Sequence, residues 1–275
     1  MCWLKKRLKI YWPFAKGNMQ KMMSYRINFF IFVLGGLIRT FVIYYLWKAV
    51  FQNSSAPTLN GFSLPDMIVY IFISSVTAGV ISCDTDFAIA GEVKDGSVAM
   101  NLIRPINYKV RMFFETLGTF LYQFIFIAIP IWVILVITRY TSSGELPPDI
   151  GTLAVYLLSM LLGFVTLFLI NFCFGLLAFF VTGIWGMSHL KGAIISFFSG
   201  ELIPIAFFPL WLQGTLNFFP FSSLSYIPVM IYLKKFTGLV LIQTLGVQFA
   251  WVAGLLIISS VLWNRAAKRL TIFGG

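Results

Sequence analysis

The chain has 275 residues, of which 59% are hydrophobic and only 11% are charged. An ordinary soluble domain carries about 25% charged residues, so this composition excludes a soluble fold. The 30 Phe and 8 Trp exclude intrinsic disorder. In a soluble protein the net charge of +11 would suggest nucleic acid, but Lys and Arg also collect at the cytoplasmic flanks of membrane helices. The composition predicts an all-α polytopic membrane protein with no nucleic-acid partner.

Residues 1–26 combine a basic run with aromatic residues and lack the small-residue cleavage site of a signal peptide. On a helix they would form an apolar face and a basic face, made respectively of Trp3, Leu4, Leu8, Tyr11 and Trp12 and of Lys5, Lys6 and Lys9. This pattern predicts an amphipathic N-terminal interfacial helix on the inner leaflet, in contact with membrane lipid. The alternative is an unstructured basic flank that only sets the topology.

Six segments are long and apolar enough to cross ~30 Å of hydrocarbon, which takes about 20 helical residues. They are residues 27–51, 66–89, 113–138, 150–182, 189–208 and 239–263. The second follows Ser63, Pro65 and Asp66, which supply a capping hydroxyl, a first-turn proline and an acid at the positive helix end. The fourth follows Asp149 in the same way. We therefore expect residues 27–275 to form one domain of six transmembrane helices.

The basic residues predict the orientation of these helices. With a cytoplasmic N-terminus, three fall in outer loops, namely Arg139, Lys234 and Lys235. Fifteen then fall on the inner side, namely Lys5, Lys6, Arg7, Lys9, Lys16, Lys21, Arg26, Lys94, Arg104, Lys109, Arg111, Lys191, Arg265, Lys268 and Arg269. Both termini are therefore predicted to be cytoplasmic.

Two charges lie deep within predicted spans. Arg39 and Glu201 each follow the inner start of their span by 12 residues, so both are expected about 18 Å above the inner boundary. A charge at the centre of a membrane helix costs ~2.5–3.5 kcal/mol, and pairing offsets part of that cost. We predict an ion pair between these two residues. The alternatives are that Arg39 reaches outward to the interface and that Glu201 faces a water-filled cavity.

Other sites of chemistry are not predicted. The chain has no Gly-Lys pair and hence no P-loop, and its single His189 offers no zinc-binding pattern. Cys83 and Cys173 lie in apolar runs and are interpreted as packing residues. The sequence therefore predicts no catalytic, cofactor-binding or metal-binding residue. Three acids near the inner ends of the second and third spans, Asp84, Asp86 and Glu115, are interpreted as solvated or loosely paired.

The inner loop at residues 91–108 contains a short amphipathic segment. We expect Gly91 and Gly96 to break the second span, and Pro105 to end a short helix before the third. An apolar stripe recurs at Val98, Leu102 and Ile106. Such a stripe just beyond the membrane suits the groove of a cytoplasmic partner, although a lipid-headgroup helix or a plain connector fits equally well.

The outer segment at residues 205–233 is apolar but contains Pro209, Pro220 and Pro228. A single spanning helix with these breaks would leave backbone groups without hydrogen bonds in lipid. Two short re-entrant helices between the fifth and sixth spans, dipping into the outer leaflet, accommodate the prolines better. An aromatic-rich outer loop anchored at the interface is the alternative.

The string GEVKDGSVAMNLIRPIN at residues 91–107 resembles the coupling-helix loop of type-2 ABC transporter permeases, which has the pattern LxRPxN. Tyr25-Arg26 and Ser199-Gly200 also resemble this family, although Lys94 and Glu201 depart from its usual residues. The resemblance implies an ATPase-coupling site formed by Glu92, Val98, Leu102, Arg104, Pro105 and Ile106. It also implies an outer gate formed by Pro204, Pro209, Pro220, Phe221 and Pro228.

The resemblance further implies the membrane subunit of an ATP-driven exporter in a cell membrane, expected to be a bacterial plasma membrane. Such a permease dimerises with itself or a homologous permease and binds two ABC ATPase subunits. ATP and magnesium would bind to those partner chains. We expect the cargo to be small or lipophilic, such as a drug, an antibiotic, a peptide or a lipid.

Two other functions remain open at this stage. A stand-alone secondary transporter or channel would need no ATPase, and it would favour more membrane-buried acids than Glu201. A membrane lipid enzyme is suggested by Asp95-Gly96-Ser97-Val98-Ala99, which resembles the start of a DGxxAR signature. Met100 replaces the required arginine, so we interpret the chain as a non-enzymatic subunit.

Overall fold

The structure is a computed structural model that describes residues 2–24, 26–144, 146–181 and 183–273, without the side chains of 2–8, 26, 28–29, 32, 142–143 and 269–273. Within these ranges the helices are joined by turns and loops, and there is no strand apart from one isolated bridge between Leu59 and Phe62. The predicted all-α fold is therefore confirmed. The α-helices are α1 Cys2–Ser24, α2 Arg26–Gln52, α3 Leu64–Ile81, α4 Thr85–Lys94, α5 Ser97–Ile103, α6 Tyr108–Gln123, α7 Ile129–Ser143, α8 Ile150–Gly175, α9 Trp185–Phe198, α10 Leu210–Phe218, α11 Tyr226–Tyr232 and α12 Gly238–Phe273. A π-helical stretch covers Phe124–Ala128, and 3-10 stretches cover Leu176–Phe179 and Ile205–Phe207.

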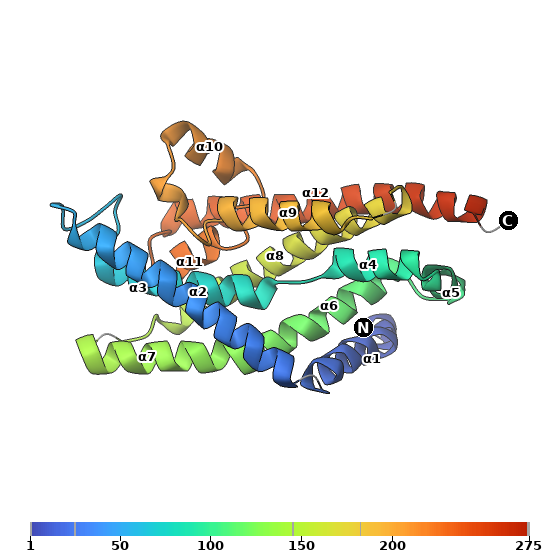
Figure 1. Cartoon of the computed structure of the whole chain (residues 1–275), viewed down its shortest axis with the longest axis horizontal. Coiled ribbons are helices and arrows are strands. Elements are labelled where there is room, and N and C mark those ends of the chain that lie inside the picture. The colour runs from blue at the N-terminus through green and yellow to red at the C-terminus, as the bar shows by residue number, and fades with distance from the viewer. Residues whose placement is uncertain (1, 25, 145, 182, 274–275) are drawn as a thin grey trace.

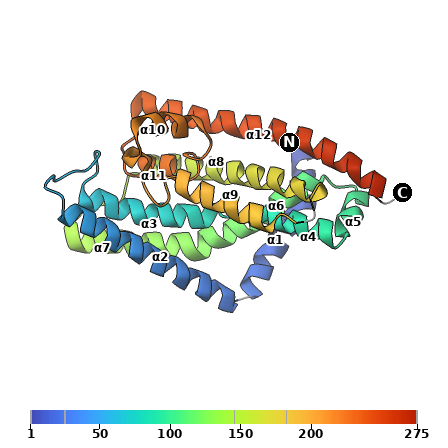
Figure 2. The same ribbon diagram turned by 45° about the horizontal axis from the view of Figure 1, so that its top comes forward.

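The long helices run side by side along one axis of the molecule, with α8 among them (Figures 1 and 2). Helix α8 packs against α3, α4, α11 and α12. Its buried face carries Met160, Phe164, Phe168 and Phe172, which recur every four residues and so share one side of the helix. The apolar core therefore surrounds α8. We call the two ends of this bundle the α5 end, toward which α1 and the last turns of α12 also lie, and the α10 end (Figure 1).

Five helical stretches in the described part of the chain are long and apolar enough to span a membrane: Val33–Gln52, Leu64–Lys94, Tyr108–Thr141, Ile150–Phe179 and Gly238–Lys268. They correspond to five of the predicted spans. The segment 189–208 differs from the prediction, because α9 begins at Trp185 and ends at Phe198. Its 14 residues rise only about 21 Å. Gly200, with a φ of 82°, turns the chain away just after the helix.

The second span starts as predicted but breaks elsewhere. The Ser63 hydroxyl accepts a hydrogen bond from the Asp66 N–H, and the Asp66 carboxylate accepts one from the Ser63 N–H, which together cap α3. Helix α3 ends at Ile81 and α4 begins at Thr85, whereas Gly91 lies inside α4. The predicted break at Gly91 is therefore wrong. The 18 residues of α3 rise about 27 Å, so the break near residue 83 lies close to one face of a ~30 Å membrane.

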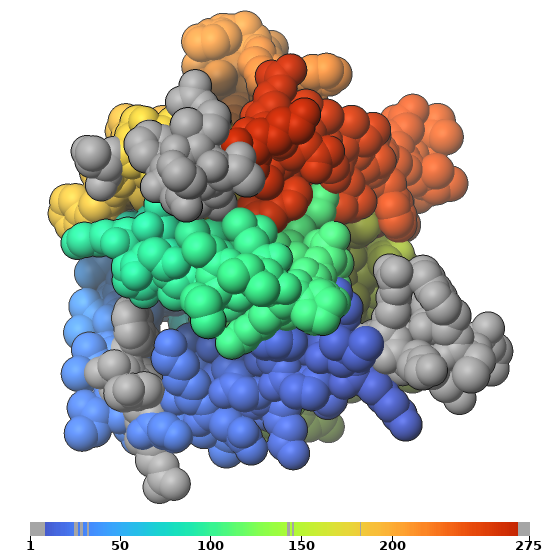
Figure 3. Space-filling model, turned by 90° about the vertical axis from the view of Figure 1, so that its right-hand side faces the viewer, coloured from blue at the N-terminus to red at the C-terminus, as the bar shows by residue number. Residues whose placement is uncertain are grey.

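Helix α1 packs lengthwise on α6. A Cβ at Gly118 would lie 2.3 Å from the carbonyl oxygen of Ala15, so only glycine permits this approach. The Asn18 amide donates hydrogen bonds to the carbonyl of Glu115 and the hydroxyl of Thr119, each at 2.7 Å. These contacts place α1 against the bundle (blue in Figure 3). The predictions of an interfacial helix and of the family resemblance rest in part on residues whose side chains lie outside the described part of the structure. These residues are Trp3, Leu4, Lys5, Lys6, Leu8, Tyr25 and Arg26.

Two short helices occupy the proline-rich segment between α9 and α12. Helix α10 projects from the side of the bundle (Figure 1), and its residues Leu210 and Trp211 are exposed. Helix α11 is buried over its whole length and packs against α3 and α8. The prediction of two short helices is therefore confirmed, whereas their depth in a membrane stays a prediction.

Candidate functional site

The loop at the α5 end forms a short helix, as its sequence pattern predicts. The chain turns at Gly96, which has a φ of 76°, and the Asp95 carboxylate accepts a hydrogen bond from the Ser97 N–H at 2.9 Å. Hydrogen bonds from the hydroxyl and the N–H of Ser97 lower the pKa of Asp95. Helix α5 follows at once and ends ahead of Arg104 and Pro105. The loop is therefore ordered by local capping.

The apolar stripe of α5 faces the bundle. Val98 is 2% exposed and packs in the core cluster that includes Ile89 and Tyr108, with Leu102 partly buried beside it. The exposed apolar side chains of α5 are on a different face, where Met100 is 65% and Ile103 is 80% exposed. Arg104 and Pro105 are also exposed, whereas Ile106 is half-buried. Val98 is therefore not accessible to a partner, whereas the docking of an ATPase on this loop stays a prediction.

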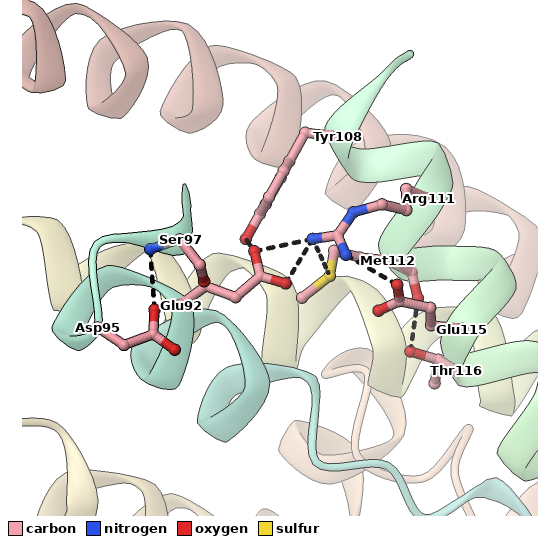
Figure 4. A network of polar contacts seen from close by, with 8 residues as sticks. All are labelled: Glu92, Asp95, Ser97, Tyr108, Arg111, Met112, Glu115 and Thr116. Carbon is pink, nitrogen blue, oxygen red and sulfur yellow. Dashed lines mark hydrogen bonds and ion pairs between the residues drawn. The ribbon is translucent and has the colours of Figure 1, made fainter. Parts of the chain in front are cut away.

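Glu92 lies in a polar network between α4 and α6 (Figure 4). Arg111 Nη2 donates to Glu92 Oε1 at 2.6 Å, and its Nη1 donates to Glu115 Oε1 at 2.8 Å. The Tyr108 hydroxyl donates to Glu92 Oε2 at 2.8 Å. The side chain of Arg111 is only 6% exposed. Tyr108 also stacks on Trp263 of α12, with ring centroids 4.6 Å apart. The end of α4 is thereby tied to both α6 and α12.

A second buried ion pair lies beside the break between α3 and α4. Lys191 Nζ of α9 lies 2.6 Å from Asp86 Oδ2 and 2.5 Å from Asn171 Oδ1 of α8. The Asn171 amide donates to the carbonyl of Cys83 at 2.6 Å. The side chains of Lys191 and Asp86 are 10% and 2% exposed. The interpretation of Asp86 as solvated or loosely paired is therefore wrong, because it is buried in a close ion pair. In the sequence Lys191 resembles an ordinary inner flank, and the only signal for this pair is Asn171, since an asparagine within an apolar span needs a polar partner.

Arg39 and Glu201 are in contact. Arg39 Nη1 of α2 lies 2.7 Å from Glu201 Oε1, and the two side chains are 49% and 13% exposed. Glu201 follows Gly200 in the chain, and the Gly200 carbonyl accepts a hydrogen bond from the Tyr70 hydroxyl of α3. A Cβ at Gly200 would also lie 2.9 Å from the side chain of Tyr226. The turn after α9 is thus held by α3 and α11, and it presents Glu201 to α2.

The residues of the expected outer gate lie around α10 and α11. Pro204 is buried ahead of the 3-10 stretch, and Pro209 is exposed directly before α10. Pro220 is buried and Phe221 half-buried in the turn between the two helices, and Pro228 is buried within α11. Of the two helices, α11 packs against α3 and α8, whereas α10 packs against the 3-10 stretch Ile205–Phe207. Whether they gate a path stays a prediction.

A comparison with known protein families matches residues 37–274 to the family described as ABC-2 family transporter protein. The chain belongs to this family. The resemblance drawn from the loop at 91–107 and from the outer motifs is thereby confirmed. This ABC-2 protein is a permease component of an ABC transporter and a multi-pass membrane protein, and its family implies association with ABC ATPase partners. No curated protein matches the chain.

Proposed function

We propose that this ABC-2 permease is the membrane subunit of an ATP-driven exporter that works as a dimer, with itself or with a homologous permease. Two ATPase subunits, which bind ATP and magnesium, dock at the α5 ends. The cargo is small or lipophilic. The excess of Lys and Arg at the α5 end supports a cytoplasmic placement of that end and of both termini in a bacterial plasma membrane.

The observation that carries this proposal is the pair of exposed apolar side chains on α5, Met100 and Ile103. Apolar residues that project into water from a firmly held helix are typical anchors for a partner groove. The buried side of α5 and the contacts of Glu92 with Arg111 would transmit a push on α5 to α6, and the ring stack of Tyr108 would transmit it to α12.

The remaining features fit the same mechanism. Helix α9 and the turn after it together act as the sixth membrane crossing, although α9 alone is too short. Helices α10 and α11 close the path at the outer face as re-entrant helices. Helix α1 lies at the inner face, where its contacts with α6 hold it beside the bundle.

The test is co-purification of an ATPase with the full-length permease in mild detergent. We expect Ile103→Asp to abolish ATPase retention while the permease remains in the membrane, because the charge would have to enter an apolar groove. The matched control is Leu146→Asp, since Leu146 is 78% exposed in the loop before α8 at the other end of the bundle. ATPase retention by the Ile103 variant, or transport by the purified permease without any other chain, would refute the proposal.

A further inference from the structure

Helix α2 leaves a wedge-shaped space beside the bundle. It packs on α3 and diverges from it toward the α5 end, where α1 joins it in a V (Figures 1 and 2). A cavity of about 710 Å³ fills this wedge, lined by α1, α2, α3, the start of α4, α6 and the stretch that follows α6. Its volume falls within the ~300–1,000 Å³ range of small-molecule sites. The outer gate and the α5 surface do not line it.

Hydrogen bonds bound the cavity on two sides. Toward the α10 end, the hydroxyls of Thr40 and Ser75 join α2 to α3 at 2.8 Å. At the α5 end, the Asn18 amide joins α1 to α6 through the carbonyl of Glu115. All four residues line the cavity. The cavity is therefore formed by helices of one chain that hydrogen bonds hold together.

The walls of the cavity change character along its length. Toward the α10 end they are apolar, with Leu37 of α2, Phe72 of α3 and Ile131 of α7. Toward the α5 end they carry charges from Lys21, Asp84 and Glu115. The break that contains Asp84 lies close to a membrane face, as the length of α3 shows, so the polar part of the cavity meets the headgroup region and the apolar part meets the hydrocarbon.

Among the carboxylates at this end of the cavity, Asp84 alone lacks an ion pair within the described residues, and the lining cation Lys21 interacts electrostatically with Glu115. Glu115 is paired with Arg111, and Asp86 next to the cavity is paired with Lys191. Asp84 makes no side-chain hydrogen bond or ion pair with any described residue, and it does not cap α4 although it occupies the N-cap position. A carboxylate at the boundary of an apolar cavity attracts a cation with an apolar body.

We propose that this cavity is a binding site for hydrophobic organic monocations, with the positive charge beside Asp84 and the apolar body against α2 and α3. As a statement about the class of cargo, this inference rests on the proposed transport function. The binding itself is a property of the permease alone, so it is tested without ATPase or transport.

The probe is radiolabelled tetraphenylphosphonium, and its binding to purified full-length permease is measured by equilibrium dialysis in mild detergent. Unlabelled tetraphenylborate has the same shape and the opposite charge. We expect saturable binding of the cation, displacement by the unlabelled cation and not by the borate, and a Kd raised about tenfold or more in Asp84→Asn. The matched control is Asp95→Asn, which removes the same charge outside the cavity and should leave the Kd unchanged.

A second variant keeps the test decisive if Asp84→Asn does not give a monodisperse protein. Leu37→Trp should fill the apolar part and abolish binding. Three results would overturn the proposal: no binding of the cation by the wild-type protein, equal competition by the borate, or an unchanged Kd in both cavity variants. A second permease chain that filled the wedge would give the first of these results. Absence of probe binding by the wild-type permease, together with full retention of the ATPase, would refute this inference and leave the proposed function intact.

Discussion

Removing one partner of the buried pair between α4 and α9 should strongly destabilise the permease. In Lys191→Met, the side chain of Asp86 would stay 2% exposed but would lose the ammonium group that lies 2.6 Å away. Breaking a buried pair in this way costs about 3–5 kcal/mol, because the remaining charge has no solvent and no partner. At ~2–4 °C for each kcal/mol, the midpoint of thermal unfolding should fall by about 6–20 °C. The double variant Asp86→Asn/Lys191→Met removes both charges and should recover most of this loss.

The assay is the fraction of monodisperse protein after heating in mild detergent, measured by size-exclusion chromatography. Lys234→Met is the matched control, since Lys234 and Asp149 form an exposed pair in which the side chains are 55% and 59% exposed. That change should cost less than about 1 kcal/mol. The reasoning is refuted if Lys191→Met melts with the control, or if the double variant is no more stable than the single one.

Three further changes have defined outcomes. Gly118→Ala should detach α1 from α6 and expose α1 to limited proteolysis. The control Gly246→Ala, in the open part of α12, should leave α1 protected. Equal protection of α1 in both variants would count against the close approach of Ala15 to Gly118. Arg39→Glu or Glu201→Arg should abolish transport, and the double charge reversal should restore activity; no recovery would mean that the pair is not needed. Gly200→Ala forces a side chain into a left-handed backbone, so it should lower the free energy of unfolding by about 1–2 kcal/mol or more, as thermal melts would show.

Features that depend on a few neighbouring residues could be predicted from the sequence. The start of α3 is fixed by Ser63 and Asp66, and the start of α8 by Asp149, whose carboxylate accepts a hydrogen bond from the Thr152 N–H. The contact between Arg39 and Glu201 agrees with the equal depth predicted from helix rise, although α9 ends at Phe198 and Glu201 lies in the turn that follows it.

Features that depend on distant contacts could not be predicted in this way. The break after α3 contains neither glycine nor proline, and the Cys83 carbonyl that it frees is satisfied by Asn171 of another helix. Periodicity identified the apolar face of α5, but it does not say whether that face meets the bundle or a partner. Val98 faces the bundle because Ile89 and Tyr108 offer it an apolar surface within the same chain.

The ion pairs also indicate which contacts yield first when the permease moves. Helix α4 carries Asp86 near its start and Glu92 near its end, about 9 Å apart along its axis, and each is held by a buried cation from another helix. The contact of Arg39 with Glu201 is different, since the side chain of Arg39 is 49% exposed. Buried pairs resist separation far more than exposed ones do. We therefore expect α4 and α9 to move as one body and α2 to separate from them.

This expectation is testable by distances between spin labels in the complete transporter. One pair of labels, at Ile38 of α2 and Ile194 of α9, reports the separation of α2, and both positions are at least 40% exposed. The other pair, at Lys94 of α4 and Leu190 of α9, reports the rigid body. During ATP turnover the first distance should change while the second stays constant. A change in the second distance of equal size would show that the buried pair between Asp86 and Lys191 opens in each cycle, and the order of strengths argued from burial would then be wrong.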